Sequence, residues 1–388
     1  MRCDDIIYLD NNASTRPLAS VVDAMLPYWT DYYMNPDTPG GIDCECSVPI
    51  AAVKSELAAL IKAREANVVL TSGATEANNW VFSAIASQTR NRRCRTTHYV
   101  VSAIEHPSVL MAAKVLAERR EDCEITIVPV DSHGVVAAET VLGAVRPDTQ
   151  LVSVMLANNE SGVIQPVGAI AEGVKRIASG CVVHTDATQA LGRIAIDCDG
   201  ELDAVDCLSV SAHKCHGPKG IGALVLRKGV SLPPMLVGGE QESGMRAGTR
   251  NPPLAAGFLA AIRASADGIE MMQRVGQLRD MLERELLKRD SGVQILGRRA
   301  SRLPNTSFVA FPEFDASLVV ATLFRWGIVC STGSACSSGS DKPSGVAVAM
   351  GLDHRLLHNT VRFSLSRFTT ECEVERCIEA CDEIARCT

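Results

Sequence analysis

The sequence predicts an α/β protein that has a large domain with a mainly parallel sheet flanked by helices, and a smaller α+β domain. Two observations predict this class. Short apolar runs alternate with helical periods from about residue 67 onward, as crossover units of a parallel sheet require. After about residue 252 the pattern changes to a long helical stretch followed by a second set of strands.

The predicted strands of the large domain are continuous apolar runs, which is typical of parallel strands buried on both faces. Helices are expected between them, among others at PSVLMAAKVLAERR and AETVLGAV. In chain order the strands lie in NVVLTSG, HYVVSAIEH, EITIVPVD, QLVSVMLANNE, CVVHTDATQA and AVDCLSVSAHK. Ligands of such sheets gather at the carboxyl ends of the strands, so the polar residues that end these runs are the candidate site.

The second part of the chain begins with apolar positions at helical spacing over residues 254–289. Shorter strands are expected at TSFVAF, GIVCS and TVRFSLS. We therefore predict a large domain over 15–258 and a small domain over 259–388, with residues 1–14 packing onto the small domain.

Composition excludes several classes of protein. The 388 residues are 46% hydrophobic and 21% charged, with a net charge of -7, which argues against general nucleic-acid binding and against binding to acidic membranes. No apolar run is long enough for a membrane span, and the acidic start MRCDDIIYLDNN does not read as a secretion signal. We expect a cytoplasmic protein whose 15 cysteines are mostly reduced, because their number is odd and their spacing forms no disulfide framework.

Three strand ends carry groups that could bind a ligand or take part in a reaction. TSGATEANNW begins where a strand stops and opens a helix, whose first N–H groups favour an anion such as phosphate. Asp186 ends one apolar run and Lys214 ends another. A buried carboxylate requires partners, and a lysine in the same crevice can act as a nucleophile toward an aldehyde. The plainer alternative is that Asp186 and Lys214 simply pair with each other.

Together these groups meet the needs of pyridoxal 5'-phosphate. Its ring nitrogen requires a carboxylate, its aldehyde a lysine and its phosphate a helix terminus. His106 follows another strand and is placed to lie against a flat ring or to move protons. A histidine held by its own loop is the alternative.

At this point the chain resembles a cysteine desulfurase of the NifS/IscS type, in the class V aminotransferase family of fold-type I pyridoxal phosphate enzymes. The motifs that carry the resemblance span nearly the whole chain in the family's order. They are YLDNNAST, TSGATEANN, IEHPSV, ANNESGVIQP, HTDATQALG, SAHKCHGPKGIGAL, MRAGTRN, STGSACSSGS and VRFSLSRFT.

The resemblance implies a role for each matching residue. Lys214 would bond to the cofactor's aldehyde carbon, Asp186 would pair with the ring nitrogen, and His106 would stack on the ring and shuttle protons. Arg362 and the asparagines 12 and 158 would bind the substrate, with the carboxylate on the arginine. The remaining cofactor contacts implied are Ala74, Thr75, Ser211 and His213 near the phosphate, Asn158 and Gln189 at the ring and its phenolic oxygen, and Thr249 reaching the phosphate from the other subunit of a homodimer.

Cys336 lies in STGSACSSGS, where the neighbours are too small to enclose a thiol. The resemblance implies that Cys336 is the nucleophile that takes sulfur from L-cysteine, leaving L-alanine and a persulfide that passes to an acceptor protein. A small-residue loop allows the movement that such a transfer needs.

The chain departs from the family pattern in two places, one of them Ser366, which stands in LSRF where LGRF is common. The segment MNPDTPGGIDCECS lacks the histidine that usually follows its Asn-Pro pair. A selenocysteine lyase, a transaminase or a non-catalytic sulfur-transfer scaffold are the alternative functions. The sulfur acceptor is not specified: iron–sulfur cluster assembly, tRNA thiolation, DNA sulfur modification and biosynthesis are all compatible with the motifs. No metal site is predicted, because His354 and His358 have no evident third ligand.

Overall fold

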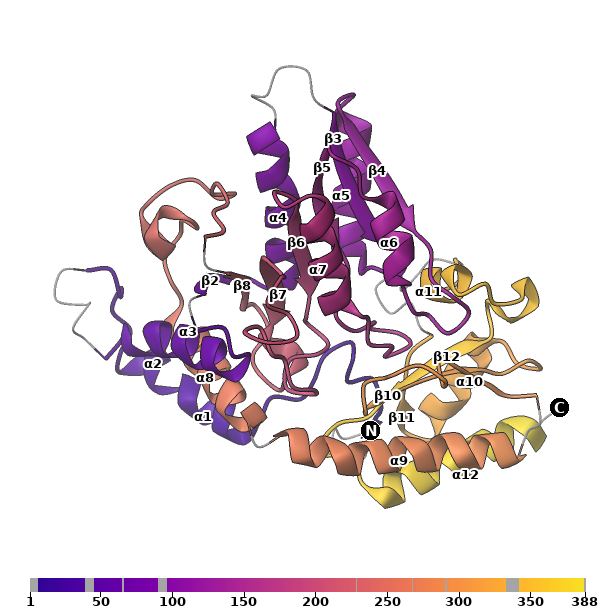
Figure 1. Cartoon of the computed structure of the whole chain (residues 1–388). Coiled ribbons are helices and arrows are strands. Elements are labelled where there is room, and N and C mark those ends of the chain that lie inside the picture. The colour runs from indigo at the N-terminus through magenta and orange to yellow at the C-terminus, as the bar shows by residue number, and fades with distance from the viewer. Residues whose placement is uncertain are drawn as a thin grey trace.

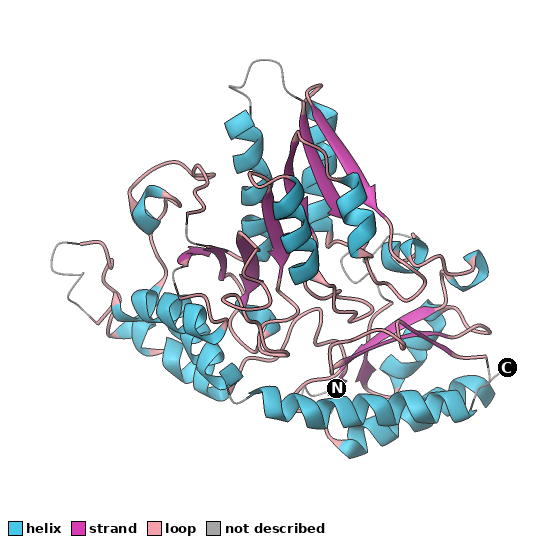
Figure 2. Ribbon diagram, viewed as in Figure 1, coloured by secondary structure: helices cyan, strands magenta, loops and turns pink. Residues whose placement is uncertain are grey.

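The computed structural model describes residues 6–38, 45–64, 66–89, 96–227, 229–266, 268–289, 292–332 and 342–386. Figure 1 shows the path of the chain and Figure 2 shows the strands enclosed by helices. None of the helices in these ranges is both long enough and apolar enough to cross a bilayer.

The large domain is built on a seven-stranded sheet with the order β2-β8-β7-β6-β5-β3-β4. All of its strands run parallel except β8, which is antiparallel to both neighbours. The predicted α/β class with a mainly parallel sheet is therefore confirmed. The strands are β2 (Asn67–Thr71), β3 (Thr97–Ser102), β4 (Cys123–Val128), β5 (Thr149–Ser153), β6 (Val182–Asp186), β7 (Cys207–Ser211) and β8 (Gly222–Leu226).

The strand β8 was not among the predicted strands. Only residues 212–221 separate it from β7, which is too short a connection for the crossover that parallel strands need. The chain therefore turns back and pairs antiparallel, with Ser211 opposite Gly222. This return places the residues after β7, including Lys214, at the carboxyl edge of the sheet.

Helices cover both faces of the sheet, and the alternation of side chains along each strand assigns residues to one face or the other. In β3, Tyr99 and Val101 pack with Trp80 and Val109 of two covering helices. Val100, between them, packs on the opposite face with Val174 and its neighbours. Both faces are therefore apolar, which explains why the strands read as continuous hydrophobic runs.

Four helices, α4 to α7, connect successive strands from β2 to β6 in crossover units (Figure 1). Two of them, α4 and α5, belong to the face of Tyr99, whereas α6 and α7 belong to the face of Val100. The bounds are α1 (Ala19–Met25), α2 (Pro27–Thr30), α3 (Val48–Leu60), α4 (Ala74–Thr89), α5 (Pro107–Arg119), α6 (Ala138–Ala144), α7 (Val167–Ile177) and α8 (Pro252–Ala266).

The small domain has a three-stranded antiparallel sheet with the order β12-β10-β9. The predicted strands at TSFVAF and TVRFSLS form β10 and β12, whereas GIVCS contributes β11, which pairs in parallel with the N-terminal β1. Ile7 and Leu9 consequently lie in the same hydrophobic cluster as Val309 and Phe363. The elements are β1 (Ile7–Tyr8), α9 (Gly268–Arg289), β9 (Gln294–Leu296), β10 (Thr306–Ala310), α10 (Ala316–Arg325), β11 (Ile328–Val329), α11 (Gly345–Ala349), β12 (Thr360–Ser364) and α12 (Glu371–Arg386).

Gly222 of β8 packs closely against the turn that precedes α4. A Cβ atom added at Gly222 would lie 2.4 Å from the backbone oxygen of Val210 and 2.8 Å from the Cα of Gly73. Only glycine therefore allows β8 to approach the end of β2 so closely.

We predict that Gly222→Ala lowers the free energy of unfolding by about 1–3 kcal/mol, because backbone atoms must shift to admit the methyl group. Urea unfolding followed by tryptophan fluorescence measures this. Gly143→Ala in α6 is the matched control, since a Cβ there meets no atom within 4 Å; it should leave stability unchanged or raise it by up to about 1 kcal/mol. Equal losses in the two variants would contradict the packing argument.

Candidate active site

A cavity of about 770 Å³ opens at the carboxyl edge of the large sheet. Residues that follow β2, β3, β5, β6 and β7 line it, and Arg362 of β12 reaches it from the small domain. It brings together residues that the sequence separates by up to 350 positions. Of the predicted site residues, those that line the cavity are Asn12, Ala74, Thr75, His106, Asp186, Gln189, Ser211, His213, Lys214 and Arg362.

Asp186 ends β6 and is 5% exposed. Its Oδ2 accepts a hydrogen bond from Asn78 Nδ2 at 2.7 Å, and its Oδ1 accepts one from the backbone N–H of Thr188 at 2.9 Å. Both donors are neutral. The carboxylate is thus solvated by the protein but is not neutralised by a cation of the described residues.

Lys214 lies in a short 3-10 helix, Ala212–Lys214, directly after β7. Its Nζ donates hydrogen bonds to the backbone oxygens of Asn12 at 2.6 Å and of Ala13 at 2.8 Å. The plainer alternative, that Lys214 pairs with Asp186, is therefore wrong: the two groups share one cavity, but each has other partners.

The N-terminus of α4 faces the same cavity through Ala74 and Thr75. Glu76 in its first turn accepts from the backbone N–H of Ser72 at 2.8 Å and is held by both ends of the Arg246 guanidinium, at 2.9 and 3.1 Å. Burial acts to raise the pKa of Glu76, but the hydrogen bonds from Arg246 and Ser72 outweigh it and the pKa is lowered. Arg246 therefore offsets the negative charge of Glu76 beside a helix terminus that favours anions.

His106 is the N-cap of α5, where its Nδ1 accepts from the backbone N–H of Ser108 at 3.1 Å. That bond identifies Nδ1 as the nitrogen without a proton when the ring is neutral. Burial lowers the pKa of His106, and the positive charge of Lys214 lowers it further against the opposing effect of Asp186. The ring is accordingly a neutral imidazole near pH 7.

Arg362 is almost fully buried and joins three parts of the chain. Its Nη2 donates to Asp10 Oδ1 at 2.5 Å, its Nη1 donates to the backbone oxygen of Asn159 at 3.0 Å, and its Nε is buried with no hydrogen-bond partner among the described residues. The Nδ2 of Asn12 donates to the same oxygen of Asn159 at 3.1 Å. A buried N–H that lacks an acceptor is unusual, and here it belongs to a side chain that lines the cavity.

Three predicted site residues are not placed in this cavity. Asn158 is fully buried. Its Nδ2 donates to Ile104 O, and its Oδ1 accepts from the backbone N–H groups of Glu160 and Ser161. Its neighbours Asn159 and Glu160 line the cavity instead. Thr249 lines an adjacent pocket of about 210 Å³ that shares Ser72 and Gly220 with the main cavity. Cys336 lies outside the described residues.

Two buried acids at the cavity were missed from the sequence. Glu105 is 4% exposed, and its Oε1 accepts from Ser102 Oγ at 2.6 Å and Met155 N at 2.7 Å, while Oε2 has no partner among the described residues. Burial raises the pKa of Glu105 to about 8. Burial also raises the pKa of Glu160, whose Oε2 accepts from Ser344 Oγ at 2.5 Å. Both acids sit inside quoted motifs, IEHPSV and ANNESGVIQP, and a charge in an otherwise apolar or small-residue stretch is the signal that could have found them.

Metal binding finds no support in the described ranges, where no three His, Cys, Asp or Glu side chains gather into a group that could hold an ion. The free thiols of Cys181, Cys198 and Cys215 are buried, and burial raises the pKa of each to about 12. Such thiols are poor nucleophiles because they remain protonated.

An α/β chain that presents an amine, a buried carboxylate and a helix terminus to one cavity at the edge of its sheet has the site of an enzyme that handles a small anionic ligand. The family model described as Aminotransferase class-V matches residues 7–377, and the chain belongs to this family. This confirms the resemblance seen in the motifs.

Relatives within the family are similar along nearly the whole chain. A cysteine desulfurase of Nostoc sp. is 39% identical over 381 residues, which cover 98% of this chain and 92% of that protein. A solved NifS-like protein is 34% identical with a TM-score of 0.89 and covers 99% of this chain and 100% of its own. A structure described as SspA in complex with cysteine is 28% identical with a TM-score of 0.80, over 94% of this chain and 100% of its own.

The raised pKa of Glu105 predicts how stability depends on pH. In the unfolded chain this acid loses its proton near its ordinary pKa of 4.5, whereas in the folded protein it does so near 8. The stability that the buried, protonated acid contributes is therefore complete below about pH 4.5, falls as the pH rises, and is lost above about pH 8.

Glu105→Gln removes this dependence, because an amide mimics the protonated acid at every pH. As the pH rises from 5 to 8.5, the free energy of unfolding of the wild type should fall while this contribution stays constant in the variant. The difference between the two should therefore grow in favour of the variant, by a few kcal/mol at most. Urea unfolding at several pH values measures the difference. The control Glu375→Gln, on the exposed side of α12, should run parallel to the wild type, and the same behaviour in Glu105→Gln would refute the burial argument.

Proposed function

We propose that the chain is a cysteine desulfurase that uses pyridoxal 5'-phosphate to transfer sulfur from L-cysteine to Cys336. The observation that carries the proposal is the placement of Lys214 and Asp186 on one cavity without pairing to each other. Membership of the class V family and the full-length similarity to cysteine desulfurases support the choice of reaction.

The residues of the cavity fit the cofactor. Asp186 keeps its negative charge for a protonated ring nitrogen, because its present donors are the neutral groups of Asn78 and Thr188. Two buried oxygens beside it, Asn78 Oδ1 and Thr188 Oγ1, have no hydrogen-bond partner among the described residues. Thr75, Ser211 and His213 line the cavity near the N-terminus of α4, where a phosphate is favoured.

When bound, pyridoxal phosphate would supply an electron sink that activates the carbon–sulfur bond of the amino acid. The chain supplies everything else. Lys214 would hold the cofactor and carry a proton at Nζ. His106, neutral with an unprotonated Nδ1, would lie against the ring and accept or return a proton at Nε2. Gln189 would contact the phenolic oxygen.

Arg362 would bind the α-carboxylate of L-cysteine, with Asn12 beside it. Its buried Nε has no hydrogen-bond partner in the described part of the chain, and a guanidinium offers a planar pair of donors that a carboxylate fits. The same arginine is bridged through its backbone to Ser331, with Arg362 N donating to Ser331 O at 2.7 Å. Pro343 and Val346 line the cavity as well. The chain thus approaches and leaves the 333–341 segment beside the proposed carboxylate site.

Cys336 would attack the sulfur of the bound amino acid as a thiolate. A sulfur–sulfur bond forms and the carbon–sulfur bond breaks, and the carbon that loses sulfur gains a proton, so that L-cysteine and one thiol become L-alanine and one persulfide. The persulfide sulfur would then pass to an acceptor protein. Iron–sulfur cluster assembly is one pathway that such a sulfur serves, beside tRNA thiolation, DNA modification and biosynthesis.

We further propose a homodimer. Large apolar side chains are exposed along α1, α2 and the following turn, including Trp29 at 58% and Tyr33 at 75%, and Val237 is 86% exposed. Exposed apolar surface of this kind marks interfaces. Thr249, in a pocket contiguous with the main cavity, would reach the phosphate of the other subunit.

Replacing the proposed nucleophile tests the reaction. Cys336→Ala should abolish sulfide and alanine release from L-cysteine in the presence of excess dithiothreitol while the protein still binds the cofactor and keeps its visible absorption. Cys372→Ala is the control, because Cys372 is an exposed thiol on α12 and its loss should leave the rate unchanged.

The same assay separates the alternatives. A transaminase would not need the thiol, so full activity in Cys336→Ala would overturn the proposed chemistry. A wild-type chain that gains no absorption with added cofactor would instead indicate a scaffold. A selenocysteine lyase would turn over L-selenocysteine faster than L-cysteine, and it would keep that activity in Cys336→Ala.

Arg362→Lys tests the carboxylate site. Lysine keeps the charge but loses the planar fork, so the KM for L-cysteine should rise about ten-fold or more, a loss of about 1.4 kcal/mol in binding, with a smaller change in kcat. Arg325→Lys on the exposed end of α10 is the control. An unchanged KM in Arg362→Lys would assign the α-carboxylate to another residue.

A further inference from the structure

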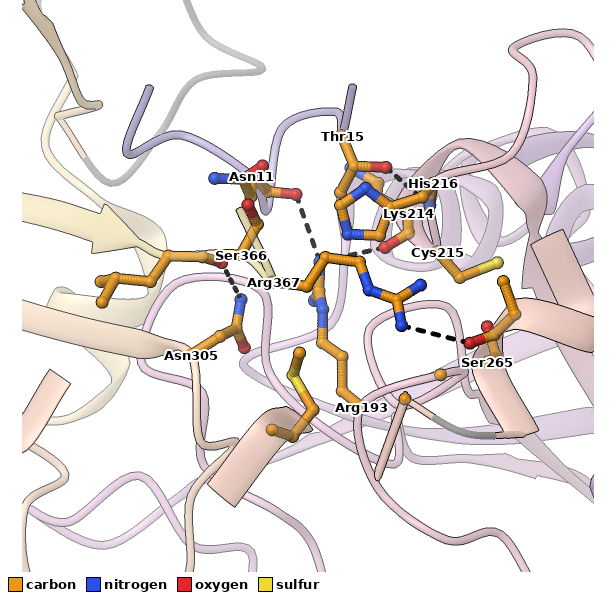
Figure 3. Close-up of a pocket in the computed structure, with 15 residues that line it drawn as sticks. Asn11, Thr15, Arg193, Lys214, Cys215, His216, Ser265, Asn305, Ser366 and Arg367 are labelled. Carbon is orange, nitrogen blue, oxygen red and sulfur yellow. Dashed lines mark hydrogen bonds between the residues drawn. The ribbon is translucent and has the colours of Figure 1, made fainter. Parts of the chain in front are cut away.

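Arg193 is a buried arginine directly behind the cofactor-binding lysine. It lies in the turn that follows β6 and is 6% exposed. Figure 3 shows the small cavity that Arg193 lines together with Lys214 and Arg367, with the Arg193 side chain between Asn11 and Lys214. Its Nη2 donates to the backbone oxygens of Asn11 and Lys214, both at 3.2 Å, and its Nη1 donates to Gln189 O at 3.2 Å and to Gln189 Oε1.

All of these acceptors are neutral. Among the described residues no carboxylate forms an ion pair with Arg193, and burial lowers its pKa to about 10. The guanidinium therefore remains charged near neutral pH. A buried cation without a counter-ion is costly. A purely structural link between four oxygens does not require a charged group.

The contact to Gln189 fixes the orientation of an amide. Arginine has five N–H donors and no acceptor, so the oxygen of Gln189, not its nitrogen, must face Arg193. The NH₂ group is then turned the other way: Nε2 donates one N–H to Asn12 O at 3.0 Å. Its second N–H remains for another acceptor, and Gln189 lines the cavity.

We propose that Arg193 is a positioning residue that locks the Gln189 amide with its N–H toward the phenolic oxygen of the cofactor and, through the carbonyl of Lys214, holds the lysine that binds that cofactor. The inference rests on the proposed function, because it concerns the same cofactor. Arg193 would then affect the pH at which the bound cofactor loses its proton, through the hydrogen bond that the Gln189 amide donates to the phenolic oxygen.

The effect can be read from the colour of the holoenzyme. The visible absorption changes with pH as the nitrogen between Lys214 and the cofactor gains or loses its proton, and a negative phenolic oxygen favours the protonated form. A hydrogen bond donated to that oxygen weakens its hold on the proton. Losing the bond should therefore raise the pH midpoint of the absorption change.

Arg193→Lys keeps the charge, but its single terminal nitrogen on a shorter side chain cannot span Gln189 Oε1 and the backbone oxygens of Asn11 and Lys214 as the two Nη atoms do, so the amide is no longer fixed. The midpoint of the holoenzyme should rise by about 0.5 to 1 pH unit. Gln189→Ala should raise it by at least as much, and the double variant should have the midpoint of Gln189→Ala alone, because Arg193 then has no amide to orient. Additive shifts, or no shift in Arg193→Lys, would overturn the proposal.

Two further variants separate positioning from packing. Arg367→Lys changes the other arginine of this small cavity (Figure 3), which contacts Ala264 O at 3.4 Å and forms no hydrogen bond with Gln189 or Lys214 among the described residues; its midpoint should equal that of the wild type. Gln189→Glu gives Arg193 a carboxylate partner, so the packing is preserved while the N–H donor is lost, and the midpoint must still rise. If it does not, the proposal is wrong even where Arg193→Lys fails to fold.

The readout also separates this inference from the proposed function. A wild-type chain that binds no cofactor or releases no sulfide from L-cysteine contradicts the proposed function. A coloured, active wild type whose midpoint is insensitive to Arg193→Lys contradicts only the role of Arg193.

Discussion

The buried negative charge of Asp186 is the constraint on which the rest of the site depends. A carboxylate that is 5% exposed can remain ionised only if the protein replaces the water that it has lost. Here the replacement is an amide of α4 and a backbone N–H of the turn after β6. Both donors must be held in place, so the docking of α4 on the sheet and the conformation of the turn serve the same group.

The other pole of the cavity is cationic and is assembled from the opposite end of the fold. Arg362 comes from the small domain, its carboxylate partner Asp10 from the N-terminal segment, and its carbonyl partner from the loop at Asn159. The N-terminal segment thus stands between the two hydrophobic clusters: Ile7 and Leu9 pack in the small domain, while the next residues contact Lys214 and Gln189 of the large one.

Much of this arrangement was predictable, because parallel strands bring their ends to one edge and polar residues at those ends stand out against apolar runs. Asp186, Lys214 and the TSGAT turn were found in that way. The antiparallel strand β8 was not predicted, because a pattern of hydrophobicity does not show that a short connection reverses the direction of the chain. Glu105 and Arg193 were missed for another reason: their roles depend on burial by distant segments, and a single charge in IEHPSV or LGRI does not reveal whether it will meet water. Asn158 is the reverse case: this motif residue does not line the cavity, because its amide bonds to Ile104 O and to the backbone N–H groups of residues 160 and 161.

The hydrogen bonds of the Lys214 ammonium have a consequence for how the protein would accept the proposed cofactor. An ammonium carries three hydrogens and gives two of them to the backbone oxygens of residues 12 and 13; once its nitrogen bonds to carbon, fewer remain to give. The oxygen of Asn12 keeps Gln189 as a donor, but that of Ala13 must find another or turn toward solvent. The N-terminal segment, whose strand β1 pairs with β11 of the small domain, thus supplies the two backbone oxygens to which Lys214 Nζ donates.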